Sequence, residues 1–297
     1  MKNKGLNIKM QKELKLGIAD IVISVIFEDK IQSSEVDGSY KYFLTNSKPD
    51  IAFYTHYGYI SKSKLGEKVF DTGTTWSFYQ NNEKYILKTS SKAIILESDF
   101  KSGDIYIRAQ GRKRKVEYPL NYPLGEVLMI NLLAQKRGVM IHSCGVSNKG
   151  QGLLFAGTSQ MGKSTMANLW KSQIANDKSQ NEGVSILSDD RIIVRKRNEQ
   201  FWIYGTPWHG DAKVCLPEKA PLEKIFFLKH ARKNMLKKLS PLEAAFRLIV
   251  CSFPTFWDKK GMEFTLEFCA ELVKRIPCYQ LGFVPDESIL DFVRDKI

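Results

Sequence analysis

The sequence predicts an α/β protein with a smaller β-rich N-terminal domain over residues 1–115 and an α/β domain over residues 116–297. Three observations predict this fold class. Short β-branched and aromatic segments dominate the first part, strands mix with helical periodicity in the second, and a glycine-rich loop there joins a strand to a helix. A chain of 297 residues is long enough for two domains that each bury a core.

Strand signals follow one another through the first domain. Residues 19–27 are apolar and rich in β-branched side chains, and segments 75–79 and 84–88 flank a predicted hairpin turn at Asn81, Asn82 and Glu83. Further strands are predicted at 93–96 and 104–108, before a basic run from Arg112 to Lys115. The domain contains no motif that indicates chemistry.

Helical periodicity begins in the second domain. Residues 123–136 have apolar side chains at helical spacing, with Pro123 near the start and Gly138 just after the end. Strands are predicted at 139–142 and 152–156, joined through Asn148, Lys149 and Gly150. The remaining predicted elements are strands at 184–187, 192–194 and 224–228, helices at 241–251 and 262–274, and a closing helix from Asp286.

Composition narrows the class of protein. The formal charge of +13 comes mostly from scattered lysines, and the basic runs lack the interleaved aromatic residues of a single-strand binder, so we expect a solvated surface and no nucleic-acid partner. No apolar run is long enough for a membrane helix, and the basic N-terminus does not lead into a signal core. The five cysteines contain no C-x-x-C and indicate reduced, mostly buried thiols. We therefore expect a cytoplasmic enzyme.

One motif indicates phosphate chemistry. The pattern G-x-x-x-x-G-K-[ST] is complete, after the apolar strand 153–156 and before an amphipathic helix that contains Trp170. Its glycines let the backbone surround phosphate oxygens, its lysine reaches the terminal phosphates, and its serine can bind Mg²⁺. The predicted nucleotide-binding residues form this loop, called the phosphate loop below: Gly157, Thr158, Ser159, Gln160, Met161, Gly162, Lys163, Ser164 and Thr165.

An acidic pair follows the next strand. Asp189 and Asp190 come after Ser188, at the end of the strand 184–187, where strand ends build ligand sites in open α/β sheets. Adjacent side chains point to opposite sides of an extended backbone, so one carboxylate can face a metal ion while the other faces an acceptor. We predict that both contribute to magnesium binding and catalysis. The alternative is a polar turn before Arg191.

Two further places are candidates. His142 ends a strand that neighbours the phosphate-loop strand through the hairpin, so it is either a catalytic group or a core histidine. The loop 205–211 combines glycines with Pro207, Trp208 and Asp211. Asp211 can supply another magnesium contact and Trp208 a surface for nucleotide or substrate; the alternative is a rigid connecting loop.

Together these residues resemble the family of HPr kinase/phosphorylase, whose nucleotide domain is related in fold to phosphoenolpyruvate carboxykinase. The resemblance rests on the segment from Ile141 to Gly145, the phosphate loop, the acidic pair and the loop 205–211, in that order. It implies ATP and Mg²⁺ as cofactors, with Lys163 and Ser164 on phosphate and magnesium. It also implies that Asp189 and Asp190 divide metal binding and deprotonation of a serine hydroxyl, with His142 beside the acceptor.

The chain departs from the bifunctional members of that family. Thr165 stands where they carry an acidic residue, and the loop 205–210 replaces their Glu-x-Arg-Gly-Leu segment. This second pattern resembles kinases of peptide-tailoring systems, which implies a peptide or small-protein acceptor. The N-terminal domain would then recruit the acceptor or act as a lid. The sequence leaves the acceptor's identity and the oligomeric state open.

Two other functions remain as alternatives. A carboxykinase-like enzyme acting on a small carboxylic acid would need clustered arginines and a transition-metal site that uses His142 or His209, and the sequence has no such arginine cluster. A non-catalytic nucleotide-dependent binding module is the other alternative, and the charge of +13 would suit nucleic acid as its partner. Mutation of Asp190 separates it from a kinase, because only the kinase would lose phosphoryl transfer.

Overall fold

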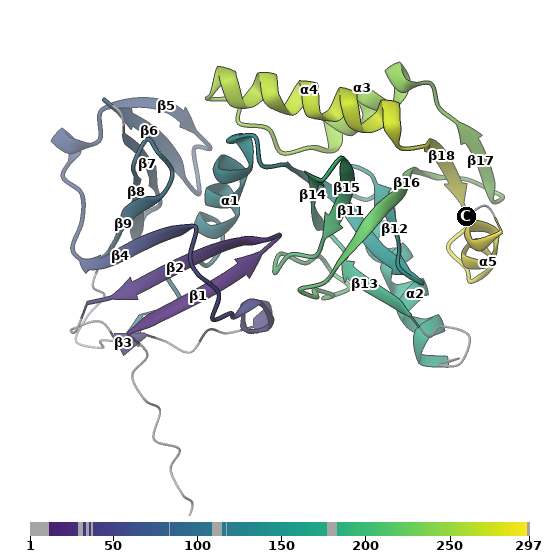
Figure 1. Cartoon of the computed structure of the whole chain (residues 1–297), viewed down its shortest axis with the longest axis horizontal. Helices are drawn as coiled ribbons and strands as arrows, with labels where there is room; N and C mark the ends of the chain where they lie inside the picture. Colours follow the sequence, from purple (N-terminus) through teal and green to yellow (C-terminus); the bar gives the residue numbers. More distant parts are fainter. Residues whose placement is uncertain are drawn as a thin grey trace, which may run out of the picture. The chain divides into compact units, whose positions relative to one another are not determined.

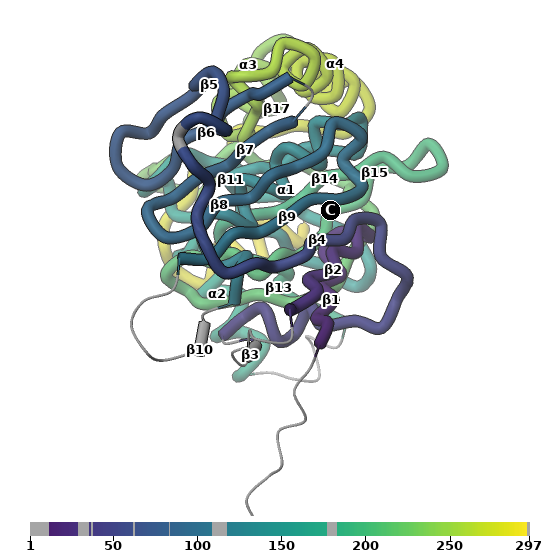
Figure 2. The backbone as a smooth tube through the Cα atoms, turned by 90° about the vertical axis from the view of Figure 1, so that its left-hand side faces the viewer, coloured from purple at the N-terminus to yellow at the C-terminus, as the bar shows by residue number. Residues whose placement is uncertain are grey.

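A computed structural model gives the fold of the chain and describes residues 12–28, 32–33, 36, 38–82, 84–108, 115–116, 118–176 and 183–295 (Figures 1 and 2). The chain divides into two compact units, Met1–Leu128 and Met129–Ile297, and the division falls within helix α1 (Leu124–Ala134). Each unit contains a large eight-stranded sheet, so the predicted mixture of helices and sheets is confirmed. Residues 112–114 of the basic run lie outside the described residues, and the domain boundary predicted there stays a prediction.

The first unit is built on one mixed sheet. Strand β4 pairs in parallel with β2 and β9, and the other neighbours pair antiparallel. A short parallel pair, β3 (Gln32–Ser33) and β10 (Lys115–Val116), and two 3-10 turns, η1 (Gly38–Phe43) and η2 (Lys62–Lys64), complete it. The order is β1 (Glu13–Ile18), β2 (Ile21–Phe27), β4 (Ile51–Tyr57), β9 (Ser102–Ile107), β8 (Lys92–Leu96), β7 (Lys84–Lys88), β6 (Ser77–Asn81) and β5 (Glu67–Asp71).

Turn residues decide where strands of this unit begin. The single strand predicted over 19–27 is wrong at its start, because Ala19 and Asp20 have φ angles of 51° and 55° and form the turn between β1 and β2. The predicted hairpin is confirmed by the antiparallel pairing of β6 and β7, with Asn82 at a φ of 51°. Its strand begins at Ser77, two residues later than predicted. Glu83 of the predicted turn lies outside the described residues.

The second unit has its own sheet, in which five strands pair in a closed ring. β12 pairs with both β11 and β16, while β11, β14, β15 and β16 pair in succession. β13 pairs with β11 outside this path. The order is β12 (Gln151–Ala156), β11 (Val139–Asn148), β14 (Arg191–Arg197), β15 (Gln200–Tyr204), β16 (Lys219–His230), β18 (Cys278–Phe283) and β17 (Met235–Lys238), with β13 (Val184–Ser188) beside β11.

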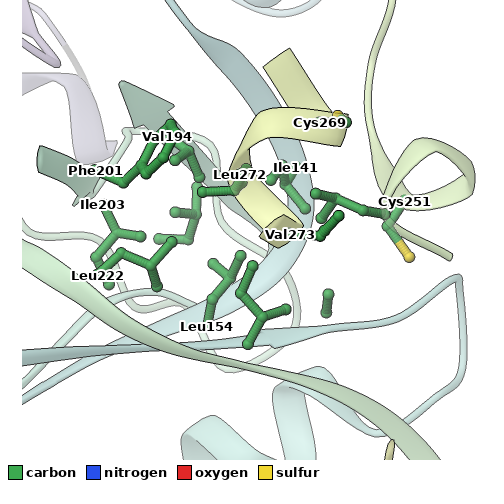
Figure 3. Close-up of a cluster of buried hydrophobic side chains, with 14 of the residues drawn as sticks. Ile141, Leu154, Val194, Phe201, Ile203, Leu222, Cys251, Cys269, Leu272 and Val273 are labelled. Carbon is green, nitrogen blue, oxygen red and sulfur yellow. The ribbon is translucent and has the colours of Figure 1, made fainter. Parts of the chain in front are cut away.

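One apolar cluster joins this sheet to two helices, α3 (Pro241–Cys251) and α4 (Lys259–Arg275). Figure 3 shows Ile141 of β11, Leu154 of β12 and Val194 of β14 in the cluster with Leu272 and Val273 of α4. All five side chains are buried. The burial of apolar surface at this junction stabilises the unit.

A second apolar cluster holds helix α2 (Lys163–Asn176) against the sheet. Met166, Ala167 and Trp170 of α2 are fully buried and pack with Phe155 of β12 and Phe226 of β16. These two phenylalanine rings stack with centroids 5.2 Å apart. The helix that begins at the phosphate loop is therefore fixed by its apolar face. The closing helix α5 (Ser288–Arg294) packs in the same cluster and begins two residues later than predicted.

Several predicted strands are longer in the structure than in the sequence analysis. The strand predicted at 139–142 runs on to Asn148, and the one predicted at 224–228 covers Lys219–His230. The cysteines are all free and buried, as predicted. Burial raises the pKa of Cys251 to about 11 and those of Cys269 and Cys278 to about 12. Across the described ranges, every helix is too short or too polar to span a bilayer.

Candidate phosphate-binding and phosphoryl-transfer site

The glycine-rich loop joins a buried strand to a helix, as its motif predicts. β12 ends at Ala156 and α2 begins at Lys163. Gly162 has a φ of 94°, and a Cβ at this position would lie 2.5 Å from Cζ of Phe283. Both the backbone conformation and the available space therefore require glycine here. The first N–H groups of α2 have no partner within the helix, so this end is suited to bind an anion.

Lys163 is held inside the loop. Its side chain donates a hydrogen bond of 2.9 Å from Nζ to the carbonyl oxygen of Thr158, and the residue is only 6% exposed. The loop therefore folds around the ammonium group. Burial lowers the pKa of Lys163, and the nearby carboxylate of Asp190 opposes that shift. The ammonium group is therefore positioned before any phosphate binds.

Asp189 ties three parts of the site together. Its Oδ1 accepts hydrogen bonds from the backbone N–H groups of Gly210 and Val214, at 3.0 and 3.3 Å. Its Oδ2 accepts from the N–H of Ala212 at 2.9 Å and from the hydroxyl of Ser164 at 3.2 Å. The residue is fully buried. Its carboxylate thus fixes the Ser164 hydroxyl and the loop 210–214 in one arrangement.

Asp190 faces a different set of partners. Its Oδ1 lies 2.8 Å from Nε2 of His142, and its Oδ2 pairs with the guanidinium of Arg191. Burial would raise the pKa of Asp190, but the hydrogen bond from His142 and the charge of Arg191 hold it below its ordinary value. Phe253 supports both partners, since the Arg191 guanidinium lies 4.4 Å from its ring centroid and the His142 ring 6.0 Å away.

The loop 205–211 contributes its backbone and one carboxylate. Trp208 is 7% exposed, and its carbonyl oxygen accepts a hydrogen bond of 3.1 Å from the hydroxyl of Ser188. The suggestion that Trp208 offers a surface to nucleotide or substrate is therefore wrong, because the ring is packed inside the unit. Asp211 is exposed and lines the pocket next to the phosphate loop.

These elements surround a pocket of about 410 Å³. Of the predicted catalytic and metal-binding residues, the pocket brings together His142, Lys163, Ser164, Asp190 and Asp211. Asp189 is not on its wall, but its carboxylate accepts a hydrogen bond from Ser164, which is. Of the predicted nucleotide-binding residues, Gly157, Thr158 and Met161 also lie off the wall. The lining residues are His142, Ser159, Gln160, Gly162, Lys163, Ser164, Thr165, Asp190, Gly210, Asp211 and His230.

Three residues of the site were missed in the sequence. His230 ends β16, the strand parallel to β12, and its Nε2 lies 2.9 Å from the carbonyl oxygen of Gln160. The ends of adjacent parallel strands meet at one edge of a sheet, and this rule could have found it. Arg191 was treated only as the residue after a turn. Phe253 had no sequence signal, because it reaches the site through pairing of the segment after α3 with β11.

The site fits magnesium held together with phosphate. Ser164, Asp190 and Asp211 offer hard oxygen atoms, which Mg²⁺ prefers, and Mg²⁺ is usually bound by one or two carboxylates together with substrate phosphates and water. Within the described ranges, no cluster of His, Cys, Asp and Glu could hold a metal ion by itself. The donor set therefore fits an ion that arrives with a nucleotide.

Comparisons with known proteins assign no family. No protein-family model and no curated protein matches the chain. Among solved structures, it is similar to the HPr(Ser) kinase/phosphatase from Coxiella burnetii, with 12% identity and a TM-score of 0.31, over 53% of this chain and 95% of that one. This likeness is too weak to assign a fold or a function, and membership of that family stays a prediction.

Proposed function

We propose that the chain is an ATP- and Mg²⁺-dependent kinase that transfers the γ-phosphoryl group to a serine hydroxyl of a peptide or small protein. One observation carries the proposal: Lys163 and Ser164 of the phosphate loop share a pocket with a carboxylate, Asp190, that is paired with His142. Phosphate-binding groups and an acceptor-binding carboxylate within one pocket are what phosphoryl transfer requires.

The nucleotide end of the pocket supplies positive charge. The loop N–H groups and the start of α2 would bind the β- and γ-phosphates, and Lys163 would neutralise the charge that develops on the transferring group. Magnesium would be held by Ser164 and by Asp190 or Asp211, and when bound it supplies charge neutralisation at the phosphate oxygens. Asp189 orients the Ser164 hydroxyl.

Asp190 would receive the acceptor hydroxyl. In the transfer, the serine oxygen forms a bond to the γ-phosphorus, the bond from that phosphorus to the β–γ bridging oxygen breaks, and the hydroxyl proton passes to the carboxylate. The lowered pKa of Asp190 makes it a weak base. This suits a loose transition state, in which the hydroxyl loses its proton late and orientation matters more than basicity.

The proposal that the acceptor is a serine rests on the resemblance of these motifs to kinases of peptide-tailoring systems. The carboxykinase-like alternative gains no support, because no arginine lines the pocket in the described part of the chain. The binding-module alternative predicts no transfer at all. It would leave the pairing of His142 with Asp190 without a role.

The direct test is to incubate the full-length chain with γ-labelled ATP, Mg²⁺ and the peptides encoded beside its gene. We expect label on a peptide serine, located by mass spectrometry, and loss of transfer in Asp190→Asn. ATP binding without transfer to any of these peptides, or to water, would favour the binding module. A labelled small carboxylic acid in place of a labelled peptide would favour the carboxykinase-like alternative.

A further inference from the structure

A second pocket lies entirely within the N-terminal unit, far in sequence from the phosphate loop. It has a volume of about 710 Å³, within the range of ligand-binding sites. Its wall is formed by four neighbouring strands, β6, β7, β8 and β9, and by the loop 58–66 between β4 and β5. Figure 2 shows these four strands side by side.

The floor of this pocket is apolar. Ile60, Leu65 and Ala93 line it and are buried members of one core cluster, with Tyr79 and Tyr106 packed against them. The two tyrosines are half-buried, so part of each ring is available to a ligand. Binding of an aliphatic or aromatic side chain to this floor is favourable, because apolar surface is removed from water.

The rim of the same pocket is positively charged. Lys88, Lys92 and Arg108 line it, and none of the lining residues is acidic. Lys92 donates a hydrogen bond of 3.3 Å to the carbonyl oxygen of Tyr118. Among the described residues, the side chains of Lys88 and Arg108 make no hydrogen bond or ion pair to one another or to a neighbour. Two cations beside an apolar floor are therefore suited to pair with an anionic ligand.

The turn between β7 and β8 stiffens this rim. The Thr89 hydroxyl oxygen accepts hydrogen bonds from the backbone N–H groups of Ser91 and Lys92, at 3.3 and 3.0 Å. The Thr89 side chain therefore holds the turn in one conformation. Ser90 and Ser91 also line the pocket and add hydroxyl groups that can bind a carboxylate.

We propose that this pocket binds an acidic peptide segment, with an aliphatic or aromatic side chain on the floor and neighbouring carboxylates on Lys88 and Arg108. The floor favours a peptide over a nucleic acid, because Ile60, Leu65 and Ala93 offer no donor or acceptor to a base edge. A single-strand binder would also need cations along a continuous track. The pocket serves to recruit the acceptor peptide; this role rests on the proposed function, whereas the binding itself does not.

Binding is tested on the full-length chain without ATP, by fluorescence anisotropy. The probes are two labelled octapeptides in which a central Phe or Leu is flanked by Asp and Glu, each compared with a version in which Asn and Gln replace the acids. We expect the acidic probes to bind at least about 10-fold more tightly than the neutral ones, since each charge-assisted contact is worth more than a neutral one.

Charge reversal locates the site. Lys88→Glu combined with Arg108→Glu should weaken acidic-probe binding at least about 10-fold, while Lys48→Glu combined with Lys101→Glu should not, because these exposed lysines lie outside the pocket. The two variants have the same net charge. Equal weakening in both, or acidic probes that bind no better than neutral ones, would overturn the proposal. If oligo-dT displaces the probe and its own binding is lost in Lys88→Glu/Arg108→Glu, the pocket binds nucleic acid and the proposal is also overturned.

Phosphorylation assays separate this proposal from the kinase assignment. In Lys88→Glu/Arg108→Glu, the KM for the acceptor peptide should rise with kcat little changed, because remote binding is lost and the reacting groups are intact. Probe binding at the pocket in a chain that never transfers phosphate would retain the site and reject the kinase. Normal KM in the double variant, with kinase activity present, would reject recruitment through this pocket.

Discussion

The Ser164 hydroxyl donates a hydrogen bond of 3.2 Å to Oδ2 of Asp189, and this contact joins the phosphate loop to the strand end that carries the acidic pair. Asp189 is fully buried and off the pocket wall, whereas Asp190, the next residue, lines the pocket. The two residues form the bend between β13 and β14, and their carboxylates bind different partners there. The two carboxylates therefore have different surroundings, and their variants should differ in kind.

Asp189→Asn is expected to destabilise the chain as well as to lower activity. An amide nitrogen cannot accept a hydrogen bond, so at least one of the donors now bound by the carboxylate would lose its acceptor inside the unit. Such a loss costs about 1–3 kcal/mol for each buried group left without a partner. Urea unfolding measures this change, and hydrogen exchange should rise in the loop 210–214. A variant with unchanged stability would contradict the conclusion that Asp189 holds Ser164 and the loop 210–214 in place.

Asp190→Asn is expected to lose the transfer and to lose only the part of the stability that pairing with Arg191 and His142 provides. The pocket is open at this residue, so water can form some of the hydrogen bonds that the carboxylate forms now. The acceptor hydroxyl, however, loses its partner. We expect kcat to fall by about 100-fold or more, as for loss of a general base or orienting group, with ATP affinity within about 3-fold of the parent. Single-turnover kinetics and calorimetry measure the two quantities. Parental kcat would exclude Asp190 from the acceptor step.

The phosphate loop and the acidic pair could be predicted from sequence because their signals are local. The loop motif stands between an apolar strand and an amphipathic helix, and Asp189 and Asp190 directly follow a strand. Which of the two carboxylates lines the pocket could not be predicted. It depends on backbone N–H groups of Gly210, Ala212 and Val214, which carry no side-chain signal.

Other parts of the fold needed long-range pairing to define them. β18 (Cys278–Phe283) is stabilised between β16 and β17, and its segment alone has no clear alternation. β1 does alternate, with buried residues at every second position, so its signal was present in the sequence. Helix α3 has its predicted ends, and its start carries a local signal, since Pro241 follows the N-cap Ser240, whose hydroxyl and Glu243 form a capping box.

Lys163→Met should abolish most of the transfer. The side chain is nearly isosteric and keeps the packing, but it removes the positive charge and the hydrogen bond to the Thr158 carbonyl. Loss of an electrostatic group of this kind lowers kcat by about 100- to 1000-fold. Lys171→Met is the matched control, because Lys171 is an exposed lysine on the same helix. Rates that fall equally in both variants would place the effect outside the phosphate loop.

Gly210→Ala should disturb the site through contact alone. A Cβ at this position would lie 2.8 Å from Oδ2 of Asp189 and 3.2 Å from Oγ of Ser164. The added methyl group would push the loop away from the carboxylate, which costs about 1–3 kcal/mol by the usual penalty for overpacking. Both the unfolding free energy and kcat should fall. His209→Ala, in the same loop and exposed, is the control; equal effects would argue for a general sensitivity of the loop.

The last prediction concerns His56 in the N-terminal unit, whose Nε2 lies 2.6 Å from Asp104 and whose Nδ1 pairs with Glu28. Burial works to lower the pKa of His56, but the hydrogen bonds that its ring donates to these carboxylates raise it above 6.5. The pairing therefore contributes stability that is fully present below pH 6.5 and is lost as pH rises through the raised pKa. Calorimetric unfolding at about pH 5.5 and about pH 8.5 should show this loss in the parent chain but not in His56→Asn. The same pH dependence in both would contradict the assignment.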